Sequence, residues 1–213
     1  MEEKKFIITI NREYGTGGRT IAYKLGELLG VKVYDRAILQ KLSEHFHLSA
    51  DEMETLKGRK SHWWDEFLSV YSQHDIAGCI TMEVPTYVTS QQLYDAEEQL
   101  LQSLAYQESC IIVGRTGFHI FKNEPAALKI MLIASEEKRL NRIMKKFNIN
   151  KNEALHRMEE IDKARENFTK TFAGVSRYDA RNYDIVWNVG NFEDIESTVS
   201  TLADIIRKRY NLK

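Results

Sequence analysis

The residues whose types and spacing suggest chemistry form a glycine-rich run that follows a short apolar segment. The run consists of Gly15, Thr16, Gly17, Gly18, Arg19 and Thr20. Residues 6–10 before it are predicted to form a buried strand, and residues 19–29 carry apolar side chains at helical spacing. Glycines let successive backbone N–H groups converge on an anion, and a helix N-terminus adds a partial positive charge. The run therefore predicts a phosphate-binding loop.

This loop departs from the usual pattern GxxxxGK[ST] at the residue that carries the positive charge. When the pattern is laid on residues 12–20, Arg12 takes the place of the first glycine and Gly18 takes the place of the lysine. That lysine brings a cation to the β- and γ-phosphates of a nucleotide. Arg12 or Arg19 would have to supply the charge here, and Thr20, one residue beyond the Ser/Thr position of the pattern, is expected to be the loop hydroxyl that meets Mg²⁺. An ordinary glycine-rich turn is the alternative interpretation.

Two more charged residues follow predicted strands. Residues 31–34 are predicted as a strand that ends at Asp35, and residues 110–113 as a strand that runs into Gly114 and Arg115. Ligands of open α/β sheets bind at the carboxyl edge of the strands. Arg115 could bind a phosphate with two N–H groups or form a structural salt bridge. Asp35 could contact an acceptor group, act through Mg²⁺, or cap the helix that begins at Arg36.

The elements that must position these residues alternate between strands and helices. Two further strands are predicted over residues 128–133 and 183–188, and helices over 38–46, 91–106, 135–147, 151–168 and 194–210. This alternation indicates an α/β fold in which helices cover both faces of a five-stranded parallel sheet. Residues 49–88 are polar apart from aromatic residues such as Trp63 and Trp64, and are expected to pack as helices over one side of the core.

Bulk properties exclude several classes of protein. A net charge of -1 argues against a nucleic-acid or anionic-membrane partner. No apolar stretch approaches the roughly 18 residues of a membrane span, so a cytoplasmic location is expected. The cysteines, Cys79 and Cys110, lack metal spacing, and Cys110 is predicted to be a buried apolar residue. His45 and His47 diverge on a helix, so no transition metal is expected.

Several segments together resemble the cytidylate kinase-like family, a nucleoside monophosphate kinase branch of the P-loop NTPase superfamily. They are, in chain order, ITINREYGTGGRTIAYKLGELLGVKVYDRAIL, SCIIVGRTGFHIF, LKIMLIASEEKRLNRI, IDKAREN and NYDIVWNVG. The resemblance implies a three-layer α/β/α sandwich formed by one domain over residues 1–213. It also implies a helical acceptor-side insertion at 36–90 that binds the nucleoside monophosphate (NMP), and a lid-like helical segment at 148–182.

The resemblance assigns roles to individual residues. The run at residues 15–20 would hold the phosphates of ATP, Thr20 would bind Mg²⁺, and Asp35, Arg36 and Arg115 would contact the acceptor. Residues 171–181 would close over the transferring phosphoryl group. The catalytic arginines would be Arg12, Arg19, Arg165, Arg177 and Arg181.

Other charged residues near these positions are predicted to contact solvent or to neutralise neighbouring side chains on their own helices. Arg139 and Arg142, one turn apart, are expected on a solvated helix face. Asp162 and Glu166 are expected to neutralise their neighbours on the same helix.

The leading hypothesis is therefore transfer of the ATP γ-phosphoryl group to a small acceptor, with a nucleoside monophosphate such as CMP as the first candidate. The missing lysine motivates a second hypothesis, a nucleotide-binding regulator or sensor without transferase activity. A third is an interaction protein whose aromatic region at residues 49–87 forms the contact surface. The sequence leaves the oligomeric state open, and a homodimer is possible.

Overall fold

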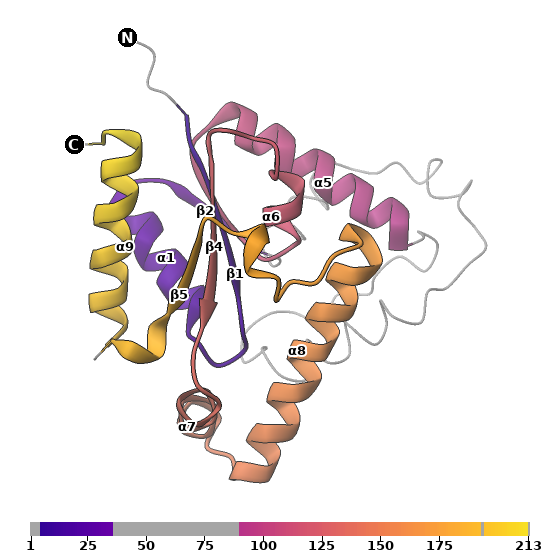
Figure 1. Ribbon diagram of the computed structural model, residues 1–213, viewed down its shortest axis with the longest axis vertical. Coiled ribbons are helices and arrows are strands. Elements are labelled where there is room, and N and C mark those ends of the chain that lie inside the picture. The colour runs from indigo at the N-terminus through magenta and orange to yellow at the C-terminus, as the bar shows by residue number, and fades with distance from the viewer. Residues whose placement is uncertain (1–4, 36–89, 193, 213) are drawn as a thin grey trace.

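The computed structural model describes residues 5–35, 90–192 and 194–212 (Figure 1). The predicted helix at 38–46, the segment 49–88 and most of the expected insertion at 36–90 lie outside the described residues. So do Arg36, Cys79, His45 and His47. Within the described ranges, no helix combines the length and apolar character that crossing a membrane requires.

The centre of the molecule is a sheet of five parallel strands in the order β2-β3-β1-β4-β5. The strands are β1 (Ile7–Arg12), β2 (Lys32–Tyr34), β3 (Cys110–Val113), β4 (Ala127–Ile133) and β5 (Ile185–Asn188). The runs of β-branched residues that predicted the inner strands are buried on both faces, as parallel strands require. The predicted five-stranded α/β architecture is confirmed, although β5 begins two residues later than expected.

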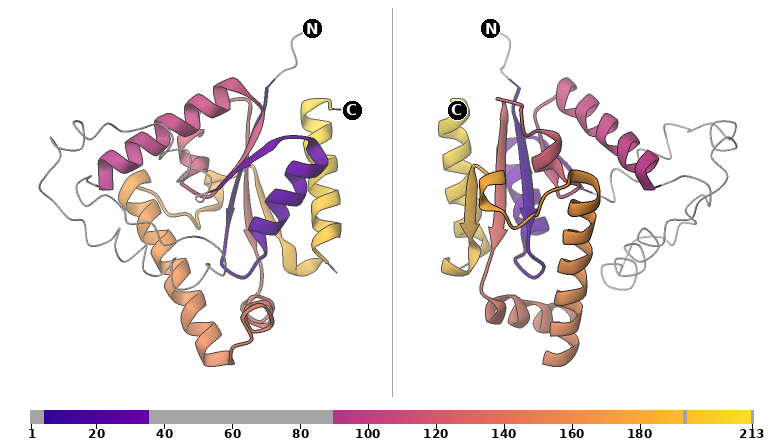
Figure 2. Two further views of the ribbon diagram at one scale, coloured as in Figure 1. Left: turned by 180° about the vertical axis from the view of Figure 1, so that it is seen from behind. Right: turned by 45° about the vertical axis from the view of Figure 1, so that its right-hand side comes forward.

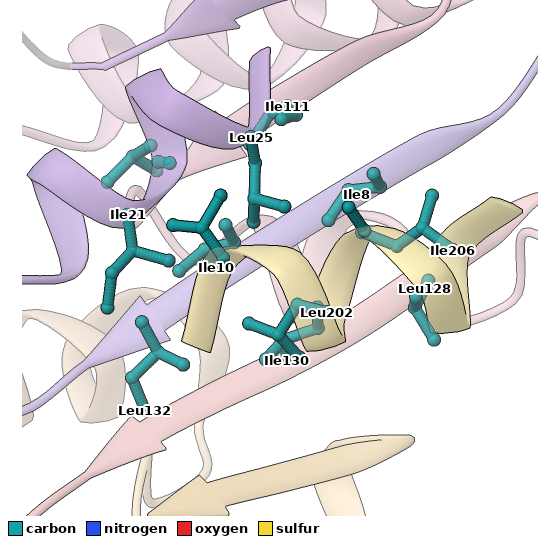
Figure 3. Close-up of a cluster of buried hydrophobic side chains, with 14 of the residues drawn as sticks. Ile8, Ile10, Ile21, Leu25, Ile111, Leu128, Ile130, Leu132, Leu202 and Ile206 are labelled. Atoms are coloured by element: carbon teal, nitrogen blue, oxygen red, sulfur yellow. The ribbon is translucent and has the colours of Figure 1, made fainter. Parts of the chain in front are cut away.

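One face of the sheet is covered by α1 (Gly18–Leu29) and α9 (Ile195–Tyr210), which lie side by side (Figures 1 and 2). Ile21 and Leu25 of α1 and Leu202 and Ile206 of α9 are fully buried against the inner strands (Figure 3). Asp194 begins α9 by accepting a hydrogen bond from the Ser197 amide. This packing fixes the start of α1, and with it the glycine-rich loop, to the end of β1.

The opposite face is covered by α5 (Ser90–Gln107) and the short α6 (Gly117–Ile120), which lie across the sheet from α1 and α9 (Figure 2). Their core includes Leu101, Phe121 and Cys110, all buried. Burial raises the pKa of the Cys110 thiol to about 12 and keeps it protonated. The prediction that Cys110 is a buried apolar residue is therefore confirmed.

The two remaining helices lie beyond the carboxyl ends of the strands, where Figure 1 shows α7 below β4 and α8 rising beside the sheet. They are α7 (Glu136–Phe147), capped by Ser135, and α8 (Lys151–Ala173), which begins with a capping box formed by Asn150 and Glu153. The two helices enclose a small apolar cluster that contains Tyr14 of the glycine-rich loop. Short 3-10 turns at Ala180–Asn182 and Val189–Asn191 flank β5.

Helix α8 runs five residues beyond its predicted end at residue 168. The residues beyond it include Thr169 and Ala173, which are buried, and the helix stops at Gly174 with a left-handed φ of 67°. The lid-like segment is therefore one long helix followed by a tight return to the sheet.

Candidate functional site

The glycine-rich loop between β1 and α1 is shaped by α7, which packs directly against it. Gly15 and Gly17 have φ values of 87° and 79°, in the left-handed region that favours glycine. A Cβ on Gly15 would lie 2.9 Å from the Cβ of Arg139, and one on Gly17 would lie 3.1 Å from Nη1 of Arg142. Both glycines are thus required by conformation and by space.

The start of α1 suits an anion. Its N-cap residue is Gly17, and no side chain of the described residues caps it or places an acidic group in its first turn. The first N–H groups of a helix have no partner within the helix and carry its partial positive charge. Thr20 is exposed in this first turn, where its hydroxyl is open to a metal ion, whereas Thr16 is buried and donates to the Glu13 carbonyl at 2.8 Å. The loop therefore fits phosphate groups, and Thr20 is the exposed hydroxyl of its first turn that could bind Mg²⁺.

Arg12 occupies the space that a side chain at position 18 would need. A Cβ on Gly18 would lie 2.9 Å from both Cβ and Cγ of Arg12. The guanidinium of Arg12 then reaches the end of β3, where a Cβ on Gly114 would overlap its Nη1 and lie 3.3 Å from its Cζ. Glycine at the usual lysine position is thus explained by the arginine stem that lies over it, and the guanidinium at the end of that stem lies beside Gly114.

Arg19, the other candidate for that cation, points elsewhere. Its Nε forms an ion pair with Oδ2 of Asp35 at 2.8 Å, and its guanidinium lies 5.6 Å from the centre of the Tyr23 ring. The Tyr23 hydroxyl donates to the same carboxylate at 3.1 Å, and burial together with the Asp35 charge raises the pKa of Tyr23. Asp35 is buried while the side chain of Arg19 is 58% exposed. The geometry therefore favours Arg12 as the cation of the loop.

Arg115 is held in a buried position at the end of β3. Its guanidinium pairs with the carboxylate of Glu97 from α5 and lies 5.2 Å from the centre of the Phe168 ring of α8. The backbone at Arg115 and Thr116 is left-handed, with φ of 53° and 54°, which is strained for residues with side chains. Such strain is often found at ligand sites, and here it turns Arg115 back toward the interior between the sheet, α5 and α8.

The three arginines expected in the lid lie in different environments. Arg177 is fully buried, and both it and Arg165 donate to the Arg12 carbonyl, Arg165 at 3.3 Å. Burial and the nearby Arg165 charge lower the pKa of Arg177. The side chain of Arg181 is 89% exposed and pairs with Asp179. The structure thus brings Arg165 and Arg177 to the loop and leaves Arg181 on the surface.

Three residues that the sequence analysis set aside also reach the loop. Arg139 donates to the Tyr14 carbonyl at 3.3 Å, and Arg142 donates to the carbonyls of Gly15, at 3.3 Å, and Thr16. Asp162 is buried and accepts the Tyr14 amide at 2.9 Å. The expectation of a solvated face for Arg139 and Arg142 is wrong, because α7 turns that face toward the loop. The sequence did contain one signal for this position, because the two arginines lie one helical turn apart on a helix that directly follows a strand.

Arginines outnumber carboxylates among the described residues around the loop. The arginines are Arg12, Arg139, Arg142, Arg165 and Arg177, and the carboxylates are Glu13, Asp162 and Glu166. Such a distribution of charge favours an anionic ligand.

The sequence profile of the cytidylate kinase-like family matches residues 7–191. The chain belongs to the cytidylate kinase-like family. The matched range contains the loop, Asp35, Arg115 and all the arginines described above. A search of curated protein sequences gave no match.

Solved structures with the same fold extend over almost the whole of this cytidylate kinase-like chain. An uncharacterized protein from Eubacterium ventriosum ATCC 27560 is 22% identical with a TM-score of 0.69, covering 99% of this chain and 100% of its own. A shikimate kinase from Acinetobacter baumannii is 11% identical with a TM-score of 0.52 and coverages of 97% and 96%. One from Bacteroides thetaiotaomicron is 14% identical with a TM-score of 0.51 and coverages of 95% and 98%. These likenesses show the P-loop kinase fold.

Proposed function

We propose that this protein transfers the γ-phosphoryl group of ATP to a small acceptor, with a nucleoside monophosphate such as CMP as the first candidate. The observation that carries the proposal is the course of Arg12. Its stem lies over Gly18 at the glycine-rich loop and its guanidinium lies against Gly114, the residue before Arg115. A cation therefore lies between the donor loop and the buried arginine that the acceptor side offers.

In this reaction the residues act through charge and position. The amides of Gly15, Gly17 and the first turn of α1 bind the β- and γ-phosphates, and Thr20 contributes its hydroxyl to Mg²⁺. The metal ion would neutralise charge on the phosphate oxygens. Arg12 stabilises the negative charge of the phosphoryl group in transit, and Arg115 binds the anionic group of the acceptor. Asp35 orients the acceptor from the end of β2.

A nucleotide-binding regulator without transferase activity is the second candidate. Two ion pairs favour it, because Asp35 is already paired with Arg19 and Arg115 with Glu97. A site whose acceptor charges stay paired within the chain would bind ATP and transfer nothing.

The two candidates are separated by measuring binding and turnover on the same protein. ATP·Mg²⁺ affinity is measured by calorimetry, and ADP release by a coupled assay with CMP, dCMP, UMP and, because of the solved neighbours, shikimate. For a kinase, we expect Arg12→Ala to lower kcat by about 100-fold or more, as the loss of one transition-state donor does. Lys24→Ala is the matched control, because Lys24 lies on α1 but pairs with Glu196.

Binding of ATP without ADP release for every acceptor tested would favour the regulator. Turnover that survives Arg12→Ala unchanged would remove Arg12 from the mechanism. If neither ATP nor any acceptor binds, the proposed function is wrong.

A further inference from the structure

Four backbone carbonyls between the end of β1 and the glycine-rich loop accept hydrogen bonds from guanidinium groups of other elements. The carbonyl of Arg12 accepts from Arg165 and Arg177, and that of Tyr14 from Arg139. Arg142 holds the next two carbonyls in the chain, those of Gly15 and Thr16. These arginines come from α7, from α8 and from the turn after α8.

This bracing determines where the loop amides point. In a trans peptide the C=O of one residue and the N–H of the next point in opposite directions. Holding the carbonyls of Tyr14 and Thr16 against α7 therefore turns the amides of Gly15 and Gly17 away from the arginines. Those two amides belong to the left-handed glycines, whose conformation allows them to face an anion.

Asp162 connects the bracing arginines to one another and to the loop. Its Oδ1 accepts the Tyr14 amide at 2.9 Å, and its Oδ2 accepts Arg139 Nη1 at 2.7 Å. Arg165 and Arg177 approach the same carboxylate at 3.6 and 3.5 Å. Its side chain is 11% exposed, so these cations have little solvent to screen them from one another.

The turn after α8 is tied to the same cluster by further hydrogen bonds. Glu166 accepts the backbone amide of Arg177 at 3.1 Å, and the Tyr183 hydroxyl donates to the Arg177 carbonyl at 2.8 Å. Asn11, near the end of β1, donates to the same hydroxyl at 2.6 Å. Residues 162–183 and the loop are thus joined by one network of hydrogen bonds and ion pairs. They contact each other directly and do not need a bound ligand to connect them.

We propose that Asp162 is a positioning residue that couples residues 162–183 to the glycine-rich loop, so that phosphate binding and docking of this segment stabilise each other. The inference rests on the proposed function in so far as the loop binds phosphate. Asp162 contacts no ligand in this scheme, and it acts through the Tyr14 amide and the arginines. By linkage, a ligand that binds only the braced loop must also protect the segment.

The test compares Asp162→Asn with Glu160→Gln, a matched change of an α8 carboxylate that pairs with His156 and is 40% exposed. Asparagine keeps the shape but removes the charge that holds three guanidinium groups together. We expect Asp162→Asn to weaken binding of ATP and of inorganic pyrophosphate at least tenfold, with Glu160→Gln within about twofold of the unchanged protein and Asp162→Glu recovering part of the loss.

Hydrogen exchange supplies a readout that needs no ligand and no activity. In Asp162→Asn we expect faster exchange both in the loop and at residues 174–183. In the unchanged protein, pyrophosphate should slow exchange in both segments together. If Asp162→Asn fails to fold, Tyr183→Phe is the second variant, because the Tyr183 hydroxyl joins the Arg177 carbonyl to Asn11 beside the loop, and faster exchange in both segments is again expected.

The outcomes separate the two proposals. Unchanged affinity and unchanged exchange in Asp162→Asn would overturn the coupling, as would pyrophosphate protection confined to the loop. If the unchanged protein binds neither ATP nor pyrophosphate, the proposed function fails. The ligand-free exchange measurement still decides whether Asp162 couples the two segments.

Discussion

The donor side and the acceptor side of this site use arginine in opposite ways. Around the glycine-rich loop, Arg139, Arg142 and Arg177 bind backbone carbonyls and leave the amides for a ligand. At the acceptor side, Arg115 is paired with the Glu97 carboxylate, and Asp35 is paired with Arg19. In the proposed function, the donor site is thus formed before a ligand arrives, whereas an acceptor would have to exchange ion pairs. Pre-formed groups lose little entropy on binding, and exchanged pairs make binding selective for ligands that replace both charges.

The largest effect should come from displacing the Arg12 guanidinium, which lies between the two sides, without removing its charge. Gly114→Ala places a Cβ where the Arg12 guanidinium lies and adds strain at a φ of 75°. We expect kcat to fall by about 100-fold, because Arg12 leaves its position between donor and acceptor. ATP affinity should change much less.

Gly30→Ala is the control for that change. Gly30 has a φ of 67°, and a Cβ there would meet nothing within 4 Å. It therefore tests backbone strain of similar size without the collision. Equal losses of turnover in the two variants would show that strain, and not the position of Arg12, causes the effect.

The second largest effect should be on stability at the acceptor side. Glu97→Gln leaves the Arg115 guanidinium buried without its carboxylate, and breaking such a pair costs about 3 kcal/mol of unfolding free energy. Inorganic phosphate should then raise the Tm of Glu97→Gln more than that of the unchanged protein, because the anion replaces the lost charge. Glu98→Gln, at the next residue of α5, is the control. A phosphate response that is the same in all three proteins would mean that Arg115 does not bind anions.

A smaller effect should follow from releasing Asp35. Arg19→Ala removes the ion pair at 2.8 Å, but the arginine side chain is 58% exposed, so the stability change should be below about 1 kcal/mol. We expect ATP affinity to stay within about twofold and the KM of the acceptor to change severalfold. A loss of kcat as large as that expected for Arg12→Ala would return Arg19 to the role of loop cation.

The smallest effect is expected on the outer surface of the lid-like segment. Arg181→Ala removes a side chain that is 89% exposed and pairs with Asp179. ATP affinity measured by calorimetry should be unchanged, in contrast to variants of the buried Arg177. A tenfold loss of affinity in Arg181→Ala would show that the segment closes much further over the nucleotide than these contacts indicate.

Much of this organisation could be predicted from the sequence because it is local. Apolar runs and helical spacing located all five strands, and they identified the helices from Ser90 onward except the short α6. Gly15 and Gly17 indicated a glycine-rich turn between a strand and a helix, and the structure has this turn, with both glycines left-handed. The match of residues 7–191 to the cytidylate kinase-like family agrees with the resemblance carried by the motifs.

The side-chain partners could not be predicted in the same way. Charge spacing suggested that Asp162 neutralises neighbouring residues on its own helix. In the structure it also accepts a hydrogen bond from the backbone amide of Tyr14, 148 residues away in the chain. Spacing also suggested a solvated face for Arg139 and Arg142, because the helical pattern shows which residues share a face but not what packs against it.

The sequence by itself determined an α/β fold of the P-loop kinase type, with a glycine-rich loop that lacks the lysine of the usual phosphate-binding pattern. It left Arg12 and Arg19 as equal substitutes, because both lie within a few residues of the loop. The tertiary structure places the two side chains differently, since the end of β3 brings Gly114 under the Arg12 guanidinium while the end of β2 brings Asp35 to Arg19, and on this ground we propose Arg12 as the loop cation. Local patterns fix which elements form, but the direction of a long charged side chain depends on the space and charges supplied by distant parts of the chain.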